Sequence, residues 1–562
     1  MTATKSSQVL QGTSPTWSVS ATGFVTQSGT VDNIQADTTL PTVYLLGEIE
    51  GADKYLTCKS SNISFNGYLA SNGDLYLCGD NSSGQQGSGN TTDVKTLTKR
   101  ASNVKKAVLT SHSSWYLNED NELYSCGYNQ FGNHGTGTKG DSEYITTFAK
   151  RAENVKDFYV DKENNVTWYI TNTGDLYGCG RNDCGQQGSG NTTDVLVFTK
   201  RAENVKEFKM ETNYYYSRYL TNDGDLYGCG LNNAGQQGNG TTNNVTTFSK
   251  IASNVKSFGF NWYVNTSNEL YLTGSNNFGQ QGKGNVGDTV LTFTKRAENI
   301  KKFIESDDFL INWYITNDGD LYGCGYGAGY AQGSGSNANV TTFTKRAENV
   351  KDAFKSRYLT AYLTNDDDLY LCGQNDYGQQ GNGTTTAVTN FTKRASNVKS
   401  FDTWSGYFCW YINDDDDLYG CGLNSYGNMG SGNMNNVTTF TKRGTNVKNM
   451  DFNGFATGYT TETNDLYLCG NNTHGQQGSG NTTDVTTFTK RVTGSINTAN
   501  LTISPTPADA TVTIDGEIVS TKDIRKGLTA TYTVSKTGYV TQTGTTDHLY
   551  ADTTLTIELE EE

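Results

Sequence analysis

One short string of residues, Leu-Tyr-x-Cys-Gly or a close variant, recurs nine times along this chain of 562 residues. From the first copy at Leu75 to the last at Leu466 the mean period is about 49 residues, and each period contains four short strand patterns. Units of this kind bury their apolar faces only by stacking on neighbours, as propeller blades do. We therefore predict an all-β fold, a β-propeller of nine repeats flanked by small β-sandwich modules. The copies begin at Leu75, Leu123, Leu176, Leu226, Leu270, Leu321, Leu369, Leu418 and Leu466.

The strands can be placed within one unit, for which the fourth serves as an example. There we expect strands at 205–208, 219–220, 225–229 and 245–250. Two residues before the repeated Leu, all nine units carry Gly, Asn or Asp, which tolerate the positive φ of a tight hairpin. Seven residues before the same Leu, all nine carry Tyr, which we interpret as packing between neighbouring sheets.

Proline marks the limits of the repeats, because it is poorly tolerated in paired strands. All four prolines, at positions 15, 41, 505 and 507, lie outside the array. We predict an incomplete N-terminal β module or attachment arm at 1–46, the nine-repeat propeller at 47–497, and a C-terminal β-sandwich at 498–562.

The two flanks of the array are related to each other. Residues 17–40 align with residues 532–555 at a constant offset of 515. The C-terminal copy is preceded by further alternating runs that complete a sandwich, whereas the N-terminal copy lacks this first half and leaves an open sheet edge. Our hypothesis is that a strand of another chain, or the C-terminal module, completes it. The predicted attachment residues are Trp17, Val19, Phe24 and Val25.

Composition excludes several functions. The net charge of −15 argues against binding to nucleic acid, where Lys and Arg must displace phosphate counterions. No stretch is apolar for long enough to form a membrane helix, and the start MTATKSSQVLQGTSPTW has no apolar core of a secretory signal. The four histidines do not recur in phase, and no Cys-x-x-C pair exists. We expect no cofactor, no metal and no enzyme.

The repeat unit itself resembles a known family. The string G-D-L-Y-G-C-G-x-N-x-x-G-Q-Q-G-x-G, as at 224–240, is similar to the repeats of the regulator of chromosome condensation family, which form β-propellers. That family includes nucleotide-exchange factors and interaction modules, so the resemblance implies fold more than function. This chain departs from it by having Cys in place of the family's Trp and nine units in place of seven.

The C-terminal flank carries a second resemblance. Its opening P-x-x-A-x-V-x-I-D-G, at 507–516, looks like that of PEGA-type domains. Such modules occur in bacterial surface proteins and in phage virion proteins. The resemblance implies a virion or surface protein whose flanks anchor it and whose propeller is displayed.

Antiparallel connectivity assigns every loop to one of two propeller faces. The second-to-third-strand hairpins and the K-R-A-E-N links share a face with balanced charges, which we interpret as solvated. The first-to-second-strand turns on the other face differ most between units and are rich in aromatics, as binding loops on a rigid scaffold are. The turn candidates for ligand or partner contact are Tyr214, Tyr215, Tyr216, Phe309, Trp404, Tyr407 and Phe408. Further candidates are Trp115, Trp168, Trp262 and Trp313, for which packing between blades is the alternative.

For function, the sequence favours a non-enzymatic structural or binding protein of a bacteriophage virion, such as a tail, fibre or capsid-decoration protein, or of a bacterial surface. Its expected partners are other virion or surface proteins through the flanking modules, and a host glycan or receptor on the variable face. The sequence does not decide whether the chain forms homo-oligomers. Two alternatives remain: an intracellular propeller scaffold or exchange-factor-like protein, and a glycan-active enzyme.

Overall fold

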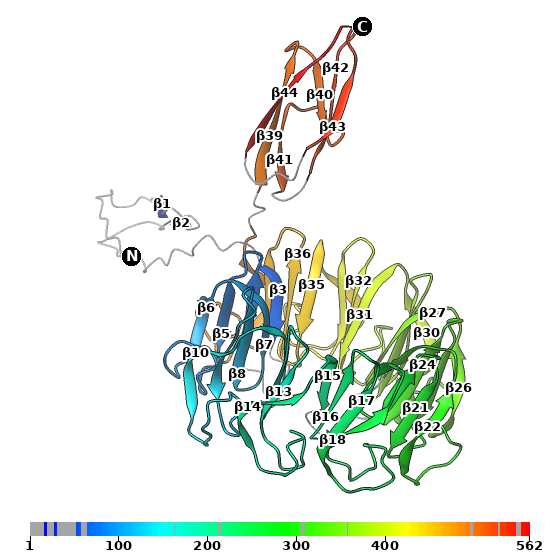
Figure 1. Cartoon of the computed structure of the whole chain (residues 1–562). Coiled ribbons are helices and arrows are strands. Elements are labelled where there is room, and N and C mark those ends of the chain that lie inside the picture. Colours follow the sequence, from blue (N-terminus) through cyan, green and yellow to red (C-terminus); the bar gives the residue numbers. More distant parts are fainter. Residues whose placement is uncertain are drawn as a thin grey trace, which may run out of the picture. The chain divides into compact units, whose positions relative to one another are not determined.

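The computed structural model describes residues 16–19, 27–30, 52–57, 65–161, 163, 165–211, 215–304, 310–356, 358–494, 498–525, 529–546 and 552–561. The chain divides into two compact units, one at Ala52–Val492 and one that combines Met1–Gly51 with Thr493–Glu562. Apart from one short 3-10 turn, η1 (Ala328–Tyr330), every regular element in the described ranges is a strand (Figure 1). None of these described elements is a helix long and apolar enough to span a membrane.

The larger unit consists of nine four-stranded antiparallel sheets, each made from four consecutive strands. The first three blades are β3 (Ala52–Thr57), β4 (Phe65–Ala70), β5 (Leu75–Gly79) and β6 (Val94–Ala101); β7 (Val104–Leu109), β8 (Ser113–Asn118), β9 (Leu123–Tyr128) and β10 (Tyr144–Ala152); β11 (Val155–Val160), β12 (Val166–Thr171), β13 (Leu176–Gly180) and β14 (Val195–Ala202). The next three are β15 (Val205–Glu211), β16 (Tyr216–Thr221), β17 (Leu226–Gly230) and β18 (Val245–Ala252); β19 (Val255–Phe258), β20 (Trp262–Asn265), β21 (Leu270–Gly274) and β22 (Val290–Ala297); β23 (Ile300–Ile304), β24 (Ile311–Thr316), β25 (Leu321–Gly325) and β26 (Val340–Ala347). The last three are β27 (Val350–Lys355), β28 (Leu359–Thr364), β29 (Leu369–Gly373) and β30 (Val388–Ala395); β31 (Val398–Trp404), β32 (Phe408–Asn413), β33 (Leu418–Gly422) and β34 (Val437–Gly444); β35 (Val447–Phe452), β36 (Ala456–Thr461), β37 (Leu466–Gly470) and β38 (Val485–Val492).

The expected turns and strands of the repeat unit are present. In the fourth blade three of the four strands cover and extend beyond their predicted runs, and the third is shifted by one residue, to Leu226–Gly230. The hairpin position two before the repeated Leu adopts the left-handed φ that its residue types predict, as at Gly73 (81°), Asn121 (62°) and Asp367 (58°). The all-β propeller fold expected from the repeats is confirmed.

The nine blades close into a ring. At eight of the nine junctions, the loop between the third and fourth strands of one blade forms a single antiparallel bridge to the fourth strand of the next, for example between Ser189 and Thr247. The same bridge joins the ninth blade back to the first, between Ser479 and Thr96. Strand β3 accordingly lies beside β35 and β36 (Figure 1). Because each blade is one continuous segment, no strand is exchanged where the ring closes.

The propeller core lies between neighbouring blades. Tyr169 of the third blade packs with Trp115 and Leu123 of the second in one apolar cluster. Its ring stacks on Tyr177 at a centroid distance of 4.9 Å and meets Phe198 edge-on at 4.9 Å. The same stacked Tyr pair recurs within all nine blades. In eight of them the in-phase Tyr also packs in one cluster with residues of the preceding blade, as predicted.

In five blades, side-chain size is complementary between directly opposed residues of the second and third strands. Large Trp faces Gly in the third, sixth and eighth blades, as in the pair of Trp313 with Gly323. In the first and ninth blades the order reverses, and Gly67 faces Leu77 while Gly458 faces Leu468. A Cβ at position 323 would lie 2.4 Å from the Trp313 ring, so the small residue is a steric requirement.

This complementarity predicts a compensating pair of substitutions. Gly323→Leu is expected to overpack the core, and Trp313→Gly to leave a cavity, each costing about 2–4 kcal/mol. Combining the two recreates the residue pair of the first blade, so the double variant should recover at least half of the summed loss. Thermal unfolding of the four proteins measures this. Strictly additive losses would show that the two side chains do not share one space.

In the fourth blade, one arginine comes from a different strand than in the other eight blades. Eight blades carry Arg after the fourth-strand Lys, but this blade has Ile251 there and has Arg218 at a position where five other blades have Trp. Arg218 is fully buried and donates to the backbone carbonyls of Gly259, at 2.9 Å, and of Gln236. Arg218 and Ile251 meet over Gly228, so each blade keeps one arginine near this point.

The other unit is described in two pieces. β1 (Thr16–Val19) and β2 (Gln27–Thr30) form an antiparallel hairpin. Near the C-terminus, the sheets β41-β39-β44 and β40-β42-β43 share one apolar core that includes Leu501, Ile514 and Val534. These strands are β39 (Thr498–Thr506), β40 (Thr511–Ile514), β41 (Thr521–Arg525), β42 (Thr531–Ser535), β43 (Gln542–Thr545) and β44 (Thr553–Glu558). Of the predicted attachment residues, Trp17 and Val19 lie in β1, while Phe24 and Val25 lie outside the described residues.

Candidate binding face of the propeller

One face of the ring carries the hairpins and the links between blades, and its charges are neutralised in pairs. Each link donates a backbone hydrogen bond to the preceding hairpin, as from Val205 N to Gly174 O at 2.8 Å. In every blade the fourth-strand Lys forms an ion pair with the acid that precedes the repeated Leu. Exposed pairs of this kind contribute about 0–1 kcal/mol each. Repeated charge compensation makes this face nearly uniform around the ring.

The opposite face carries the long loops between the third and fourth strands, and these loops are rigid. In the third blade, Asn182 Nδ2 donates to Ser189 Oγ at 2.9 Å and to the carbonyls of Asn191 and Thr193 at 3.0 Å. Its Oδ1 accepts the backbone N–H of Gln187 at 2.8 Å. The equivalent asparagine makes the same closure in most other blades. One buried side chain thus fixes a whole loop, as a rigid scaffold for recognition requires.

Aromatic side chains gather where these loops meet the turns of the next blade. Tyr377 of the seventh-blade loop contacts Tyr407 of the eighth-blade turn, with ring centroids 5.7 Å apart. Tyr426 and Phe455 repeat this contact between the eighth and ninth blades at 4.9 Å. Tyr407 is 37% exposed and the other three rings are half-buried. We call these loop-to-turn contacts the aromatic seam.

An arginine joins the seam on the other side of the ring. The Arg181 guanidinium lies over the rings of Phe131, at 5.1 Å, and Tyr215, at 4.5 Å, and donates to the Tyr215 hydroxyl at 3.0 Å. These residues come from the second, third and fourth blades. Tyr215 has a φ of 47°, which is a costly conformation for an aromatic residue and is typical of functional loops.

The sequence-predicted contact residues divide into three groups. Tyr215 is half-buried and Tyr407 is exposed on the loop face, and their role in contact stays a prediction. Tyr216 and Phe408 begin second strands and are buried, at 2% and 0% exposure, so their prediction as contact residues is wrong. Tyr214, Phe309 and the side chain of Trp404 lie outside the described residues.

The prediction that four tryptophans contact a ligand or partner is also corrected. Trp115, Trp168, Trp262 and Trp313 are buried between blades, where no ligand reaches them. Trp168, for example, packs against Phe208 of the next blade at 4.7 Å. The second strand lies inside the sheet and has a neighbouring blade on both sides, so both of its faces are core. Packing between blades, the alternative raised from the sequence, accounts for them.

Three of the seam residues that sequence reasoning missed, Phe131, Tyr377 and Tyr426, share one position. They stand immediately before the Gly of the loop string N-x-x-G, where the repeats otherwise agree. Variation within a constant loop was the available signal, because binding residues vary on a conserved scaffold. This position carries Ser83, Phe131, Cys184, Ala234, Phe278, Tyr377, Tyr426 and His474 in the eight regular loops.

One turn on this face contains a buried carboxyl group. Asp161 accepts hydrogen bonds from the backbone N–H groups of Asn165 and Val166. Burial raises the pKa of Asp161 to about 7, against the opposing effect of these N–H donors. In the ninth blade Asn453 accepts from Phe455 and Ala456 in the same way, so an uncharged amide can fill this role.

The raised pKa gives a prediction about stability and pH. Between about pH 4 and 7 the folded chain binds more protons at Asp161 than the unfolded chain, so the free energy of unfolding falls as pH rises through this range. Asp161→Asn should remove this dependence and stabilise the protein at pH 8 by on the order of 1–4 kcal/mol, with little effect at pH 4. Denaturant unfolding at both pH values measures the difference. Asn453→Asp, the reciprocal change, should introduce the dependence; equal effects of Asp161→Asn at both pH values would contradict the assignment.

The two ends of the chain match a phage head-fibre domain. Residues 2–42 and 499–558 match the family described as "Head fiber dimeric protein-like domain". A curated relative, "Head fiber dimeric protein" of Bacteroides phage crAss001, is 62% identical over 45 residues, which are 8% of this chain and 35% of that protein. The chain thus spans about a third of the length of the curated relative that it matches.

Solved structures resemble the propeller. Prp20p from Saccharomyces cerevisiae is 16% identical, with 69% of this chain and 87% of that chain covered and a TM-score of 0.39. Human WBSCR16 is 12% identical, with 67% and 96% covered and a TM-score of 0.40. A chain of the structure titled "Crystal structure of Kap60 bound to yeast RCC1 (Prp20)" is 17% identical, with 66% of this chain and 94% of that chain covered and a TM-score of 0.39.

Proposed function

We propose that this chain is a non-enzymatic structural protein of a bacteriophage virion, attached to the particle through its terminal segments and displaying the propeller. The observation that carries the proposal is the position of the head-fibre match, which precedes and follows the ring at 2–42 and 499–558. A relative that bears the name of a head-fibre protein supports a place on the head rather than the tail.

The closed ring suits attachment from both ends. The chain enters the propeller at β3 and leaves it at β38, which belong to adjacent blades. Two flanks that leave from neighbouring blades can act as one anchor. The proposed partners of this anchor are other virion proteins and, because the relative is called dimeric, a second copy of this chain. The PEGA-like character of the C-terminal module remains part of this proposal.

The loop face is the proposed recognition surface. Its aromatic seam offers half-buried rings with low conformational entropy, set in Asn- and Gln-rich loops that are already rigid. Such a surface fits a host glycan or a receptor protein. The hairpin face, whose charges are paired in every blade, has no comparable variation.

Mass spectrometry of purified particles tests the proposal. We expect peptides of this chain in gradient-purified virions at a stoichiometry that stays constant between preparations and resists a high-salt wash. Presence in the host cytoplasm alone, with none in washed particles, would contradict it and favour the intracellular scaffold. Turnover of a bacterial polysaccharide by the purified chain would favour the glycan-active enzyme instead.

A further inference from the structure

The junction between the ninth and first blades is the one place where successive blades of the ring lack a covalent link. Elsewhere the fourth strand runs directly into the next blade, as from β14, ending at Ala202, to β15, beginning at Val205. The closing junction depends on contacts such as the hydrogen bonds that Gln476 O accepts from Asn66 Nδ2 at 3.3 Å and from the Cys78 thiol at 3.2 Å. We call it the closing seam.

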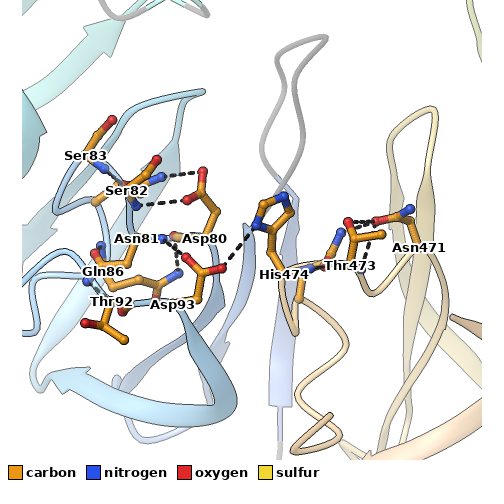
Figure 2. A network of polar contacts seen from close by, with 12 residues as sticks. Asp80, Asn81, Ser82, Ser83, Gln86, Thr92, Asp93, Asn471, Thr473 and His474 are labelled. Atoms are coloured by element: carbon orange, nitrogen blue, oxygen red, sulfur yellow. Dashed lines mark hydrogen bonds and ion pairs between the residues drawn. The ribbon is translucent and has the colours of Figure 1, made fainter. Parts of the chain in front are cut away.

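Three potential metal ligands meet at the loop-face end of this seam. His474 Nδ1 of the ninth blade lies 3.1 Å from Asp93 Oδ2 of the first. Asp80, also of the first blade, completes a group in which one ligand atom from each residue lies within 4.8 Å of the others. Figure 2 shows Asp80 and Asp93 on one loop and His474 directed toward them from the neighbouring blade.

Hydrogen bonds within the two loops hold all three residues in place. Asp80 directly follows β5 and accepts from Ser82 N at 2.9 Å and Gln85 Nε2 at 3.1 Å. Asp93 directly precedes β6, and its Oδ1 accepts from Asn81 N at 3.1 Å. The His474 backbone N–H donates to Gln476 Oε1 at 2.9 Å. A carboxylate offers about four lone-pair sites, so one that caps a loop can also serve as a ligand to a cation.

The donors are peculiar to the closing seam and are not residues of the repeat. No other blade has a carboxylate at the position of Asp80, directly after the third-strand Gly, and no other has an imidazole at the position of His474. An Asp or Asn at the position of Asp93 is common, because it caps the loop, as Asp194 and Asn244 do. Asp80 and His474 therefore occur together at the closing seam, where the two blades have no covalent link.

The distances fit a first-row transition ion. Bonds of about 2.0–2.2 Å from such an ion place neighbouring ligand atoms about 3.0–3.5 Å apart, which matches the His474–Asp93 separation. A small movement of the Asp80 carboxylate would complete the set. Two carboxylates with one imidazole suit Zn²⁺ better than Ca²⁺, which takes oxygen ligands.

We infer that Asp80, Asp93 and His474 form a binding site for one divalent transition ion, with Zn²⁺ as the expected occupant, that ties the last blade to the first. The remaining coordination positions go to water, since the site is half-exposed. The sequence-based expectation of no metal considered the spacing of residues along the chain. Asp93 and His474 are 381 positions apart, so this spacing gave no sign of the pair. Because the ion binds the closed ring better than the opened one, it stabilises the closed ring.

Calorimetric titration of the full-length, chelator-treated chain with ZnCl₂ tests the inference, together with thermal unfolding with and without Zn²⁺. We expect one ion per chain and a rise in Tm when Zn²⁺ is saturating. His474→Gln and Asp80→Asn should each weaken binding at least tenfold and abolish the Tm rise. Both variants should keep the metal-free Tm and circular dichroism of the parent protein, which separates ligand loss from misfolding.

Two matched controls complete the design. Asp484→Asn changes the ninth-blade counterpart of Asp93, which caps its loop without a facing imidazole, and should leave Zn²⁺ binding unchanged. Cys184→Ala removes a half-exposed loop thiol and introduces the residue that the fourth blade carries at that position. Absence of Zn²⁺ binding, binding that survives His474→Gln, or binding that depends on Cys184 would overturn the inference.

Discussion

A chain that lacks residues 499–558 is expected to fold its propeller and yet to be at least tenfold depleted from purified phage particles. The reason is that the nine blades form a compact unit of their own at Ala52–Val492, whereas the head-fibre match lies outside it. The measurement is quantitative mass spectrometry of particles made by a phage whose own copy of the gene is replaced by the truncated one. Circular dichroism and the Tm of the purified variant check that the ring remains folded.

The reciprocal variant is the control for this experiment. A chain in which a short flexible linker replaces 52–492 keeps both matched segments and loses the propeller. It should enter particles at the level of the full chain, since the anchor is intact. Incorporation of the truncated chain at that same level, or failure of the propeller-free chain to enter, would place the attachment on the propeller instead.

The double substitution Tyr377→Ala and Tyr407→Ala is expected to weaken adsorption of the purified full chain to host cells at least tenfold. The two rings contact each other across the aromatic seam at the surface of the loop face. Aromatic anchors at interfaces typically contribute about 2 kcal/mol or more each when truncated, so the loss of two exceeds tenfold in affinity. Binding of the labelled chain to cells over a concentration series measures the effect.

Substitutions on the other face serve as the matched control. Lys345→Ala and Lys393→Ala remove fourth-strand lysines of the sixth and seventh blades, whose ion pairs lie on the hairpin face. They should leave adsorption unchanged, because exposed pairs contribute little and lie opposite the seam. If these two reduce adsorption and the tyrosine pair does not, the recognition surface has been assigned to the wrong face.

The sequence was sufficient for the blades because every unit repeats the same local rules. In the string beginning at Leu226 every residue except the half-buried Tyr227 is buried, and the turn before it requires a residue that accepts positive φ. Nine copies of these rules leave few alternatives to a stack of similar sheets. The complementarity of Trp410 with Gly420, and the exchange that places Arg218 beside Ile251, were also visible in the repeats.

The candidate site was less accessible to sequence reasoning, for two physical reasons. Residues of the second strand, such as Trp313 and Phe408, lie between two blades. An aromatic residue close to a variable turn is therefore part of the core once it lies within that strand. The aromatic seam and the closing seam, in turn, depend on contacts between different blades. The pair of His474 with Asp93 exists only because the ninth blade meets the first.

Cryo-electron microscopy of intact particles tests the central proposal most directly. We expect density for a nine-bladed ring on the outside of the head, tethered through its terminal module, with the loop face and its aromatic seam directed away from the shell. A ring seated on the capsid by its loop face, or particles without such a ring, would contradict the account.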